Sequence, residues 1–315
     1  MSETVIQSPR SERAFVALLY AATLVAWGTS WYALKINAAS GVPIEVSVFY
    51  RFVIAAVVMV VFLLVRRGDV ILPTKLHPRL AFTGVAIFSM NFVLYYYASR
   101  TVPSGILAVC FSLVSVMNVL VASVVDRKPA DKRTLIAAFC GVFGLCAVFW
   151  PEIAGQTFDR AALLALGLCI TGNVLFCAGN FVSAGLQKRG VSVVRANAHG
   201  MFYGALAVGL VALIKGQDFS FSFEPAFLVS LGWLSIVSTV IAFAAYLTLL
   251  GRIGPGRAGT LTIAFPIVAL FISTVAEGYQ WTILAACGAA LVVMGNALTL
   301  RLPGKAQDPH PQQGS

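Results

Sequence analysis

The sequence predicts an all-α integral membrane protein with ten transmembrane helices in two inverted repeats of five. Apolar and aromatic residues make up 59% of the 315 residues and charged residues only 11%, whereas an average soluble domain carries about 25% charged residues. The apolar residues form ten runs of membrane-spanning length, and most basic residues lie in alternate connections between them. This composition excludes an intrinsically disordered chain. Six cysteines in a chain of this length also exclude a small disulfide scaffold.

Each predicted helix is a run of about 20 mostly apolar residues, the length that spans a bilayer. The runs of the first half are Ala14–Leu34, Val46–Val65, Leu80–Ala98, Gly105–Val125 and Thr134–Trp150. The runs of the second half are Ala161–Ala184, Ala196–Ile214, Ala226–Leu249, Ala258–Glu277 and Trp281–Leu300. We interpret the first run as a retained helix and not a signal peptide, because nine runs follow it and no small-residue cleavage site is evident.

The basic residues predict how the helices are oriented. With the N-terminus in the cytoplasm, 17 of the 22 Lys and Arg residues fall on the cytoplasmic side, four fall on the other side, and Arg51 lies within a helix. Cytoplasmic loops of membrane proteins carry an excess of Lys and Arg. We therefore expect a multi-pass protein of the inner (cytoplasmic) membrane with both termini in the cytoplasm. The net charge of +10 does not indicate a nucleic-acid partner, because no basic helix or stripe is present.

The two halves of the chain contain a short internal match. Residues Arg100–Gly105 open the fourth run and Arg252–Arg257 open the ninth, and the Arg and Pro of these segments match at an offset of 152 residues. Chance similarity between apolar segments is the alternative explanation. Each half has an odd number of helices, so two halves with one fold must be inverted relative to each other. Inverted repeats are typical of secondary transporters, which bind substrate near the bilayer midplane.

These features divide the chain into four segments. We expect a cytoplasmic tail at 1–13, a first five-helix repeat at 14–150, a second at 151–300 and a cytoplasmic tail at 301–315.

Several motifs resemble one transporter family. The first run contains Trp-Gly-Thr-Ser-Trp at 27–31, the second contains Arg51-Phe52, and the ninth has a central proline, Pro266, where the first half has Val114. With these motifs, residues 14–300 resemble the EamA-type branch of the drug/metabolite transporter superfamily. The resemblance implies ten helices in two repeats and the transport of a small metabolite, since members carry amino acids, sugars, nucleotide sugars, vitamins or drugs.

A narrower resemblance concerns residues 95–118. This region contains Pro103-Ser104-Gly105 and Phe111-Ser112, and it loosely resembles the bacterial riboflavin transporters of the same superfamily. Pro266 is expected to break or kink its helix and free carbonyl groups toward a cavity.

Arg51 is the clearest candidate for substrate binding. It lies about five residues into its run, which places it about 8 Å below the outer end of the helix. An ionisable residue inside the membrane usually faces a cavity or a partner. The alternative is a structural role, in which Arg51 snorkels outward and pairs with a carbonyl or with Glu45.

The other candidates are polar or aromatic residues within apolar runs. Amides donate and accept hydrogen bonds, aromatic rings stack on flat ligands, and a histidine changes charge near neutral pH. The alternatives are hydrogen bonds between helices for the amides and serines, and the interfacial belt for the tyrosines. The predicted substrate-binding residues are Arg51, Trp27, Trp31, Asn91, Tyr95, Ser112, Ser115, Asn118, Asn180 and His199.

No motif for enzyme chemistry is present. The sequence contains no phosphate-binding loop, no His-Glu-x-x-His motif and no nucleophile elbow, and its cysteines have no metal-ligand spacing. We therefore predict no catalytic residue, metal or cofactor, and only a small-molecule substrate and the bilayer as partners. The favoured function is secondary transport, with riboflavin uptake as the most specific hypothesis. Efflux of amino acids, related metabolites or drugs is the alternative. A membrane enzyme acting on lipid is a distant one, because His199, Glu277 and Arg51 would have to converge. We expect Glu277 to be the solvated end of its helix.

Overall fold

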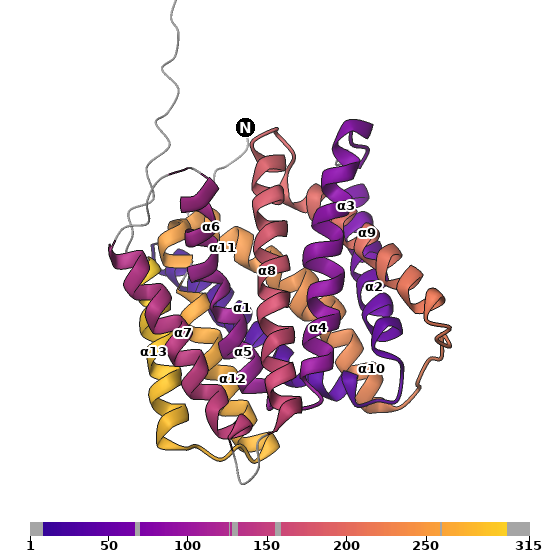
Figure 1. Cartoon of the computed structure of the whole chain (residues 1–315). Coiled ribbons are helices and arrows are strands. Elements are labelled where there is room, and N and C mark those ends of the chain that lie inside the picture. Colours follow the sequence, from indigo (N-terminus) through magenta and orange to yellow (C-terminus); the bar gives the residue numbers. More distant parts are fainter. Residues whose placement is uncertain are drawn as a thin grey trace, which may run out of the picture.

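A computed structural model describes residues 9–66, 70–125, 127, 132–154, 159–258 and 260–300 (Figure 1). These residues form helices joined by turns, with no strand among them. Eight helices are long and apolar enough to cross a membrane, and two shorter apolar helices follow them. The predicted all-α membrane fold is confirmed. The predicted tail 301–315 and most of the tail 1–13 lie outside the described residues.

The ten spans follow one another in chain order. The first half contains α1 (Pro9–Ala38), α2 (Ile44–Val65), a third span of η1 (Thr74–Leu76), α3 (His77–Val85), η2 (Ala86–Met90) and α4 (Asn91–Ala98), a fourth span of α5 (Ser104–Ser112) and α6 (Val114–Val125), and α7 (Lys132–Ile153). The second half contains α8 (Arg160–Gln187), α9 (Val193–Ile214), an eighth span of α10 (Pro225–Gly232), η3 (Trp233–Ile241) and α11 (Ala242–Ala258), α12 (Leu261–Glu277) and α13 (Ile283–Leu300).

The ninth span begins later than the sequence predicts. Residues Arg252–Arg257 do not open α12 but continue α11 to Ala258, whereas Arg100–Pro103 form the turn before α5. The short match between these segments is therefore not a match of secondary structure.

The packing of the helices repeats when the two halves are exchanged. Helix α2 packs on α9, α5 on α12 and α7 on α13, so each pair joins elements with the same place in their halves. The pair α7 and α13 runs side by side along one flank of the bundle (Figure 1). Other contacts correspond in twos, with α1 on α12 matching α8 on α6, and α1 on α11 matching α8 on α4. This exchange is the packing expected of an inverted five-helix repeat.

Glycines allow the closest of these approaches. A Cβ atom added at Gly288 of α13 would lie 2.6 Å from the carbonyl oxygen of Gly144 on α7. A Cβ atom at Gly204 of α9 would lie 2.8 Å from the carbonyl oxygen of Gly84 on α3. Small residues of this kind let transmembrane helices pack backbone to backbone.

Helical irregularities occur at equivalent places in the two halves. The third and eighth spans each contain a π-helical segment, η2 and η3, and π-segments are frequent at functional sites. The fourth span is interrupted at Leu113, between α5 and α6, whereas α12 continues as a helix through Pro266. The predicted break at Pro266 is thus absent, and the interruption lies at the corresponding point of the first half. We call the side where α1 begins the terminal face and the side where α1 ends the opposite face.

Candidate functional site

A cavity of about 350 Å³ lies between the two halves. Helices α1, α2, α4, α5 and α6 with η2 line it from the first half, and α8, α11 and α12 with η3 line it from the second. The lining residues are Trp27, Ser30, Trp31, Arg51, Phe52, Ile87, Phe88, Phe92, Phe111, Ser112, Val114, Ser115, Asn118, Phe176, Asn180, Ser238, Thr239, Phe243, Tyr246, Thr262 and Phe265. Both irregular segments η2 and η3 thus border the cavity.

Aromatic rings form much of the cavity wall. The ring of Phe111 lies 5.2 Å from that of Trp31 and 4.9 Å from that of Phe176. Nearer the terminal face, the ring of Trp27 lies 5.1 Å from that of Tyr246. Such tilted and edge-to-face arrangements leave ring faces and edges that a flat apolar ligand can contact.

Arg51 is buried at the edge of this cavity. Only 4% of its surface is exposed, and its guanidinium lies 4.2 Å from the ring centre of Phe92 and 5.1 Å from that of Phe52. One nitrogen, Nη2, donates to Oγ1 of Thr239 over 3.4 Å, and the hydroxyl of Tyr96 lies beside the guanidinium, while Nε and Nη1 have no hydrogen-bond partner among the described residues. Glu45 bonds other residues, so the alternative pairing of Arg51 with Glu45 is not observed.

The position of Thr239 follows from the π-helical segment. A π-segment shifts the carbonyl groups out of the ordinary i to i−4 pattern. The hydroxyl of Thr239 donates to the carbonyl of Leu234, five residues earlier, at 2.7 Å. The hydroxyl oxygen of Thr239 is thereby left to accept the hydrogen bond from Arg51. This bond links α2 of the first half to η3 of the second.

Seven of the ten predicted site residues line the cavity. Asn118 and Asn180 are half-buried and form no hydrogen bond within the described chain, so both amides can reach a ligand. Ser115 lies beside Asn118 on the same helix, while Ser112 accepts a 3.0 Å hydrogen bond from Asn296 on α13. The other cavity residues among the ten are Arg51, Trp27 and Trp31.

The remaining three predicted residues lie outside the cavity wall. Asn91 donates to the carbonyl of Gly172 at 2.9 Å, and Tyr95 donates to Oδ1 of Asn173 at 2.6 Å, so both join α4 to α8. Tyr95 is 1% exposed and does not belong to an interfacial belt. His199 instead bonds the carbonyl of Arg195 near the start of α9.

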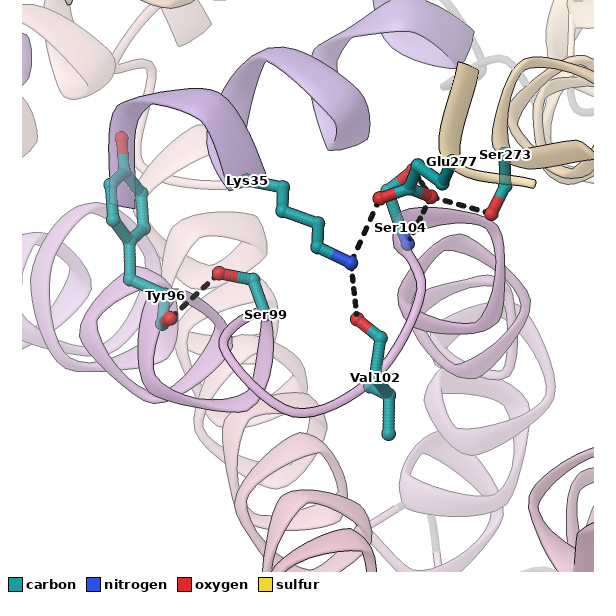
Figure 2. A network of polar contacts seen from close by, with 7 residues as sticks. All are labelled: Lys35, Tyr96, Ser99, Val102, Ser104, Ser273 and Glu277. Carbon is teal, nitrogen blue, oxygen red and sulfur yellow. Dashed lines mark hydrogen bonds and ion pairs between the residues drawn. The ribbon is translucent and has the colours of Figure 1, made fainter. Parts of the chain in front are cut away.

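A polar network joins α1, α5 and α12 near the opposite face (Figure 2). Lys35, one turn beyond Trp31 on α1, forms a 3.0 Å ion pair with Glu277 at the end of α12. The carboxylate also accepts hydrogen bonds from the backbone and hydroxyl of Ser104 at 2.9 and 2.7 Å, and from the hydroxyl of Ser273 at 2.5 Å. The Glu277 side chain is only 8% exposed. The expectation that Glu277 is a solvated helix end is wrong, because three elements converge on its carboxylate.

A second network at the same face also joins the two halves. The Glu45 carboxylate pairs with Lys215 at 2.6 Å and accepts hydrogen bonds from Gln217 at 2.7 Å and Tyr97 at 2.9 Å. The hydrogen bond that Lys215 donates to the Glu45 carboxylate raises the pKa of Lys215 above its usual value. Together with the Glu277 network, this Glu45 network joins the two halves at the opposite face. By contrast, the cavity extends toward the terminal face as far as Thr262, in the first turn of α12.

One polar part of the cavity wall, formed by Ser238 and Thr239, is not among the predicted site residues. Ser238 and Thr239 contact α1 and α2, with Ser238 donating to the carbonyl of Ala26 at 3.0 Å. Their signal was the same as that of Ser112 and Ser115, since all four are hydroxyl residues inside apolar runs.

The comparisons with known proteins agree with this architecture. The model of the EamA-like transporter family matches residues 14–150 and 161–301. The uncharacterized transporter YoaV of Bacillus subtilis is 23% identical over 270 residues, which cover 85% of this chain and 91% of that protein. The uncharacterized inner membrane transporter YedA of Escherichia coli K12 is 21% identical over 255 residues, or 80% of each chain. A solved crystal structure with 17% identity superposes with a TM-score of 0.64 and covers 90% of this chain and 95% of its own.

Proposed function

The chain belongs to the EamA-like transporter family, and from this premise we propose that it carries a small metabolite through the central cavity by alternating access. Family membership makes the protein a multi-pass membrane transporter and not an enzyme. The observation that carries the proposal is a cavity lined by both halves, which two ion-paired networks join at one face. Secondary transporters with inverted repeats place their substrate in this position.

We place this cavity in the inner membrane, with both termini in the cytoplasm. The excess of basic residues on the terminal side supports this orientation. The cavity then extends toward the cytoplasm, and the Glu277 and Glu45 networks close the outer side. Transport requires these networks to open and the terminal side to close.

Riboflavin uptake is the first specific substrate hypothesis. The aromatic walls fit a flat ring system, and the amides of Asn118 and Asn180 can bond its polar edge. The test is accumulation of labelled riboflavin in cells that lack their own flavin uptake, with and without this chain in the membrane. Saturable accumulation that excess unlabelled riboflavin blocks supports uptake. Absence of accumulation, with the protein shown in the membrane, excludes riboflavin.

Export of amino acids or related metabolites is the second candidate, and Arg51 favours it. A buried guanidinium can hold a substrate carboxylate. The same cells test this candidate by their resistance to toxic amino-acid analogues. Resistance that depends on Arg51 supports export, and unchanged sensitivity counts against it.

A further inference from the structure

We propose that the cavity selects an organic monoanion, with a ring-bearing apolar body among the aromatic residues and a single carboxylate at Arg51. This inference rests on the transport function proposed above and names the charge class of its substrate. It differs from both hypotheses given there, because riboflavin is neutral and an amino acid is a zwitterion.

The first step concerns the balance of charge. Arg51 is the one charged residue among the described residues that line the cavity. The buried carboxylates of Glu45 and Glu277 pair with other cations, Lys215 and Lys35. A buried charge without a counter-charge is costly, so an anion that enters the cavity is attracted to Arg51 more strongly than a neutral solute.

The second step concerns hydrogen bonding at the charged end. The guanidinium has hydrogen-bonding capacity left over, since its neighbours are the hydroxyls of Thr239 and Tyr96 and its Nε and Nη1 have no hydrogen-bond partner among the described residues. A carboxylate accepts two hydrogen bonds from a guanidinium in the fork arrangement, and such bonds are roughly twice as strong as those between neutral groups. Because Nε and Nη1 are buried in this structure, a bound carboxylate requires the guanidinium to turn so that two of its N–H groups face the cavity.

The third step concerns the opposite charge. No acidic side chain is present among the described lining residues, so an ammonium group would meet only hydroxyl groups, amides and rings. Ring faces attract cations weakly in comparison with a carboxylate. The cost of burying the ammonium group of a zwitterion therefore cancels part of the binding free energy that its carboxylate gains at Arg51.

The experiment uses four compounds that share one phenyl body and differ in charge: 3-phenylpropionate, its amide, phenylalanine and phenethylamine. Their dissociation constants are measured on the purified full chain in detergent, by tryptophan fluorescence excited above the phenyl absorption, since Trp27 and Trp31 line the cavity. Thermal melting with each compound provides a second measurement. The variants are Arg51→Gln and Arg51→Lys, with Arg160→Gln as the matched control, because Arg160 is exposed at the start of α8.

We expect 3-phenylpropionate to bind at least about tenfold more tightly than each of the other three compounds. The preference should disappear in Arg51→Gln, persist in weakened form in Arg51→Lys and remain unchanged in Arg160→Gln. Equal or tighter binding of the amide or of phenylalanine overturns the proposal. So does a preference that survives in Arg51→Gln, or the absence of binding by all four compounds.

A transport measurement separates this proposal from the proposed function. If a neutral solute shows saturable uptake into vesicles while the charge preference fails, the substrate class is wrong and transport stands. If 3-phenylpropionate binds through Arg51 but the chain moves none of the four compounds across the vesicle membrane, the preference stands and transport fails.

Discussion

Replacing Arg51 by methionine should raise the thermal stability of the free protein. The change removes a cation–π contact with Phe92 at 4.2 Å, worth about 0.5–2 kcal/mol. It also removes the long hydrogen bond to Thr239, which contributes about 0.5 kcal/mol. Against these losses, a charged side chain deep in the membrane costs about 2.5–3.5 kcal/mol. The balance favours methionine by about 1 kcal/mol, which raises the melting temperature by roughly 2 °C in a chain of this size.

The assay is thermal melting of the purified variant in detergent, without added ligand. Arg160→Met serves as the control, since this exposed arginine contributes little to the fold, and its melting temperature should stay within about 1 °C of the original. A fall of more than about 3 °C in Arg51→Met would refute the reasoning. It would mean that the protein itself already satisfies the guanidinium, and the argument that the substrate supplies the counter-charge would lose its basis.

Three further changes test other parts of the structure. Lys35→Glu leaves the Glu277 carboxylate without its cation, and Glu277→Lys places two cations side by side, so each should lower the melting temperature by several degrees. The double swap restores the ion pair but not the acceptor for Ser104 and Ser273, so it should recover only part of the loss; no recovery would mean that the pair is not a direct contact. Gly288→Val should destabilise the α7–α13 contact by at least about 1–3 kcal/mol through overpacking, and unchanged chemical unfolding would contradict that packing. Because the pKa of Lys215 is raised, its contact with Glu45 stabilises the fold at pH values below the ordinary lysine pKa, and this stabilisation is lost as the pH rises through the raised pKa. Above about pH 10 the melting temperature should therefore fall more steeply in the original chain than in Lys215→Met. Parallel melting curves for the two proteins would contradict this prediction.

The fold could be predicted because the membrane restricts what a chain can form. In lipid a spanning segment must satisfy its backbone hydrogen bonds internally, so long apolar runs become helices. The alternation of basic loops then fixes the number of spans. The boundary at Arg252–Arg257 could not be predicted in this way, because it depends on whether α11 continues through a polar, glycine-rich segment, and hydropathy does not measure that.

The candidate site could be predicted only in part, because a polar residue in a membrane helix has two uses. Asn118 and Asn91 give the same signal in sequence, yet Asn118 lines the cavity while Asn91 bonds Gly172 of a neighbouring helix. The direction of each side chain depends on the rotation of its helix, and the π-segments change that rotation by amounts the sequence does not reveal. Glu277 was misjudged for a similar reason, since its partners Lys35 and Ser104 are distant in sequence.

The exchange of the two halves indicates which contacts must change during transport. The pairs α2–α9, α5–α12 and α7–α13 each join an element to its own counterpart, so exchanging the halves leaves them as they are. The contacts α1–α12 and α8–α6 instead exchange with each other. In this structure α1 and α12 are fastened at the opposite face by Lys35 and Glu277, whereas the described polar contact between α8 and α6 is the 3.9 Å approach of the Cys177 thiol to the carbonyl of Val114.

We therefore expect the second conformation to bring α8 closer to α6 at the terminal face and to separate α1 from α12 at the opposite face. Arg51 lies on α2, a helix that keeps its partner α9 in both conformations, so a bound carboxylate would stay in place while access changes from one face to the other. A cross-link that holds α1 to α12 at the opposite face should accordingly stop transport without weakening the binding of 3-phenylpropionate. Weakened binding would mean that Arg51 moves with the closing helices, contrary to this assignment.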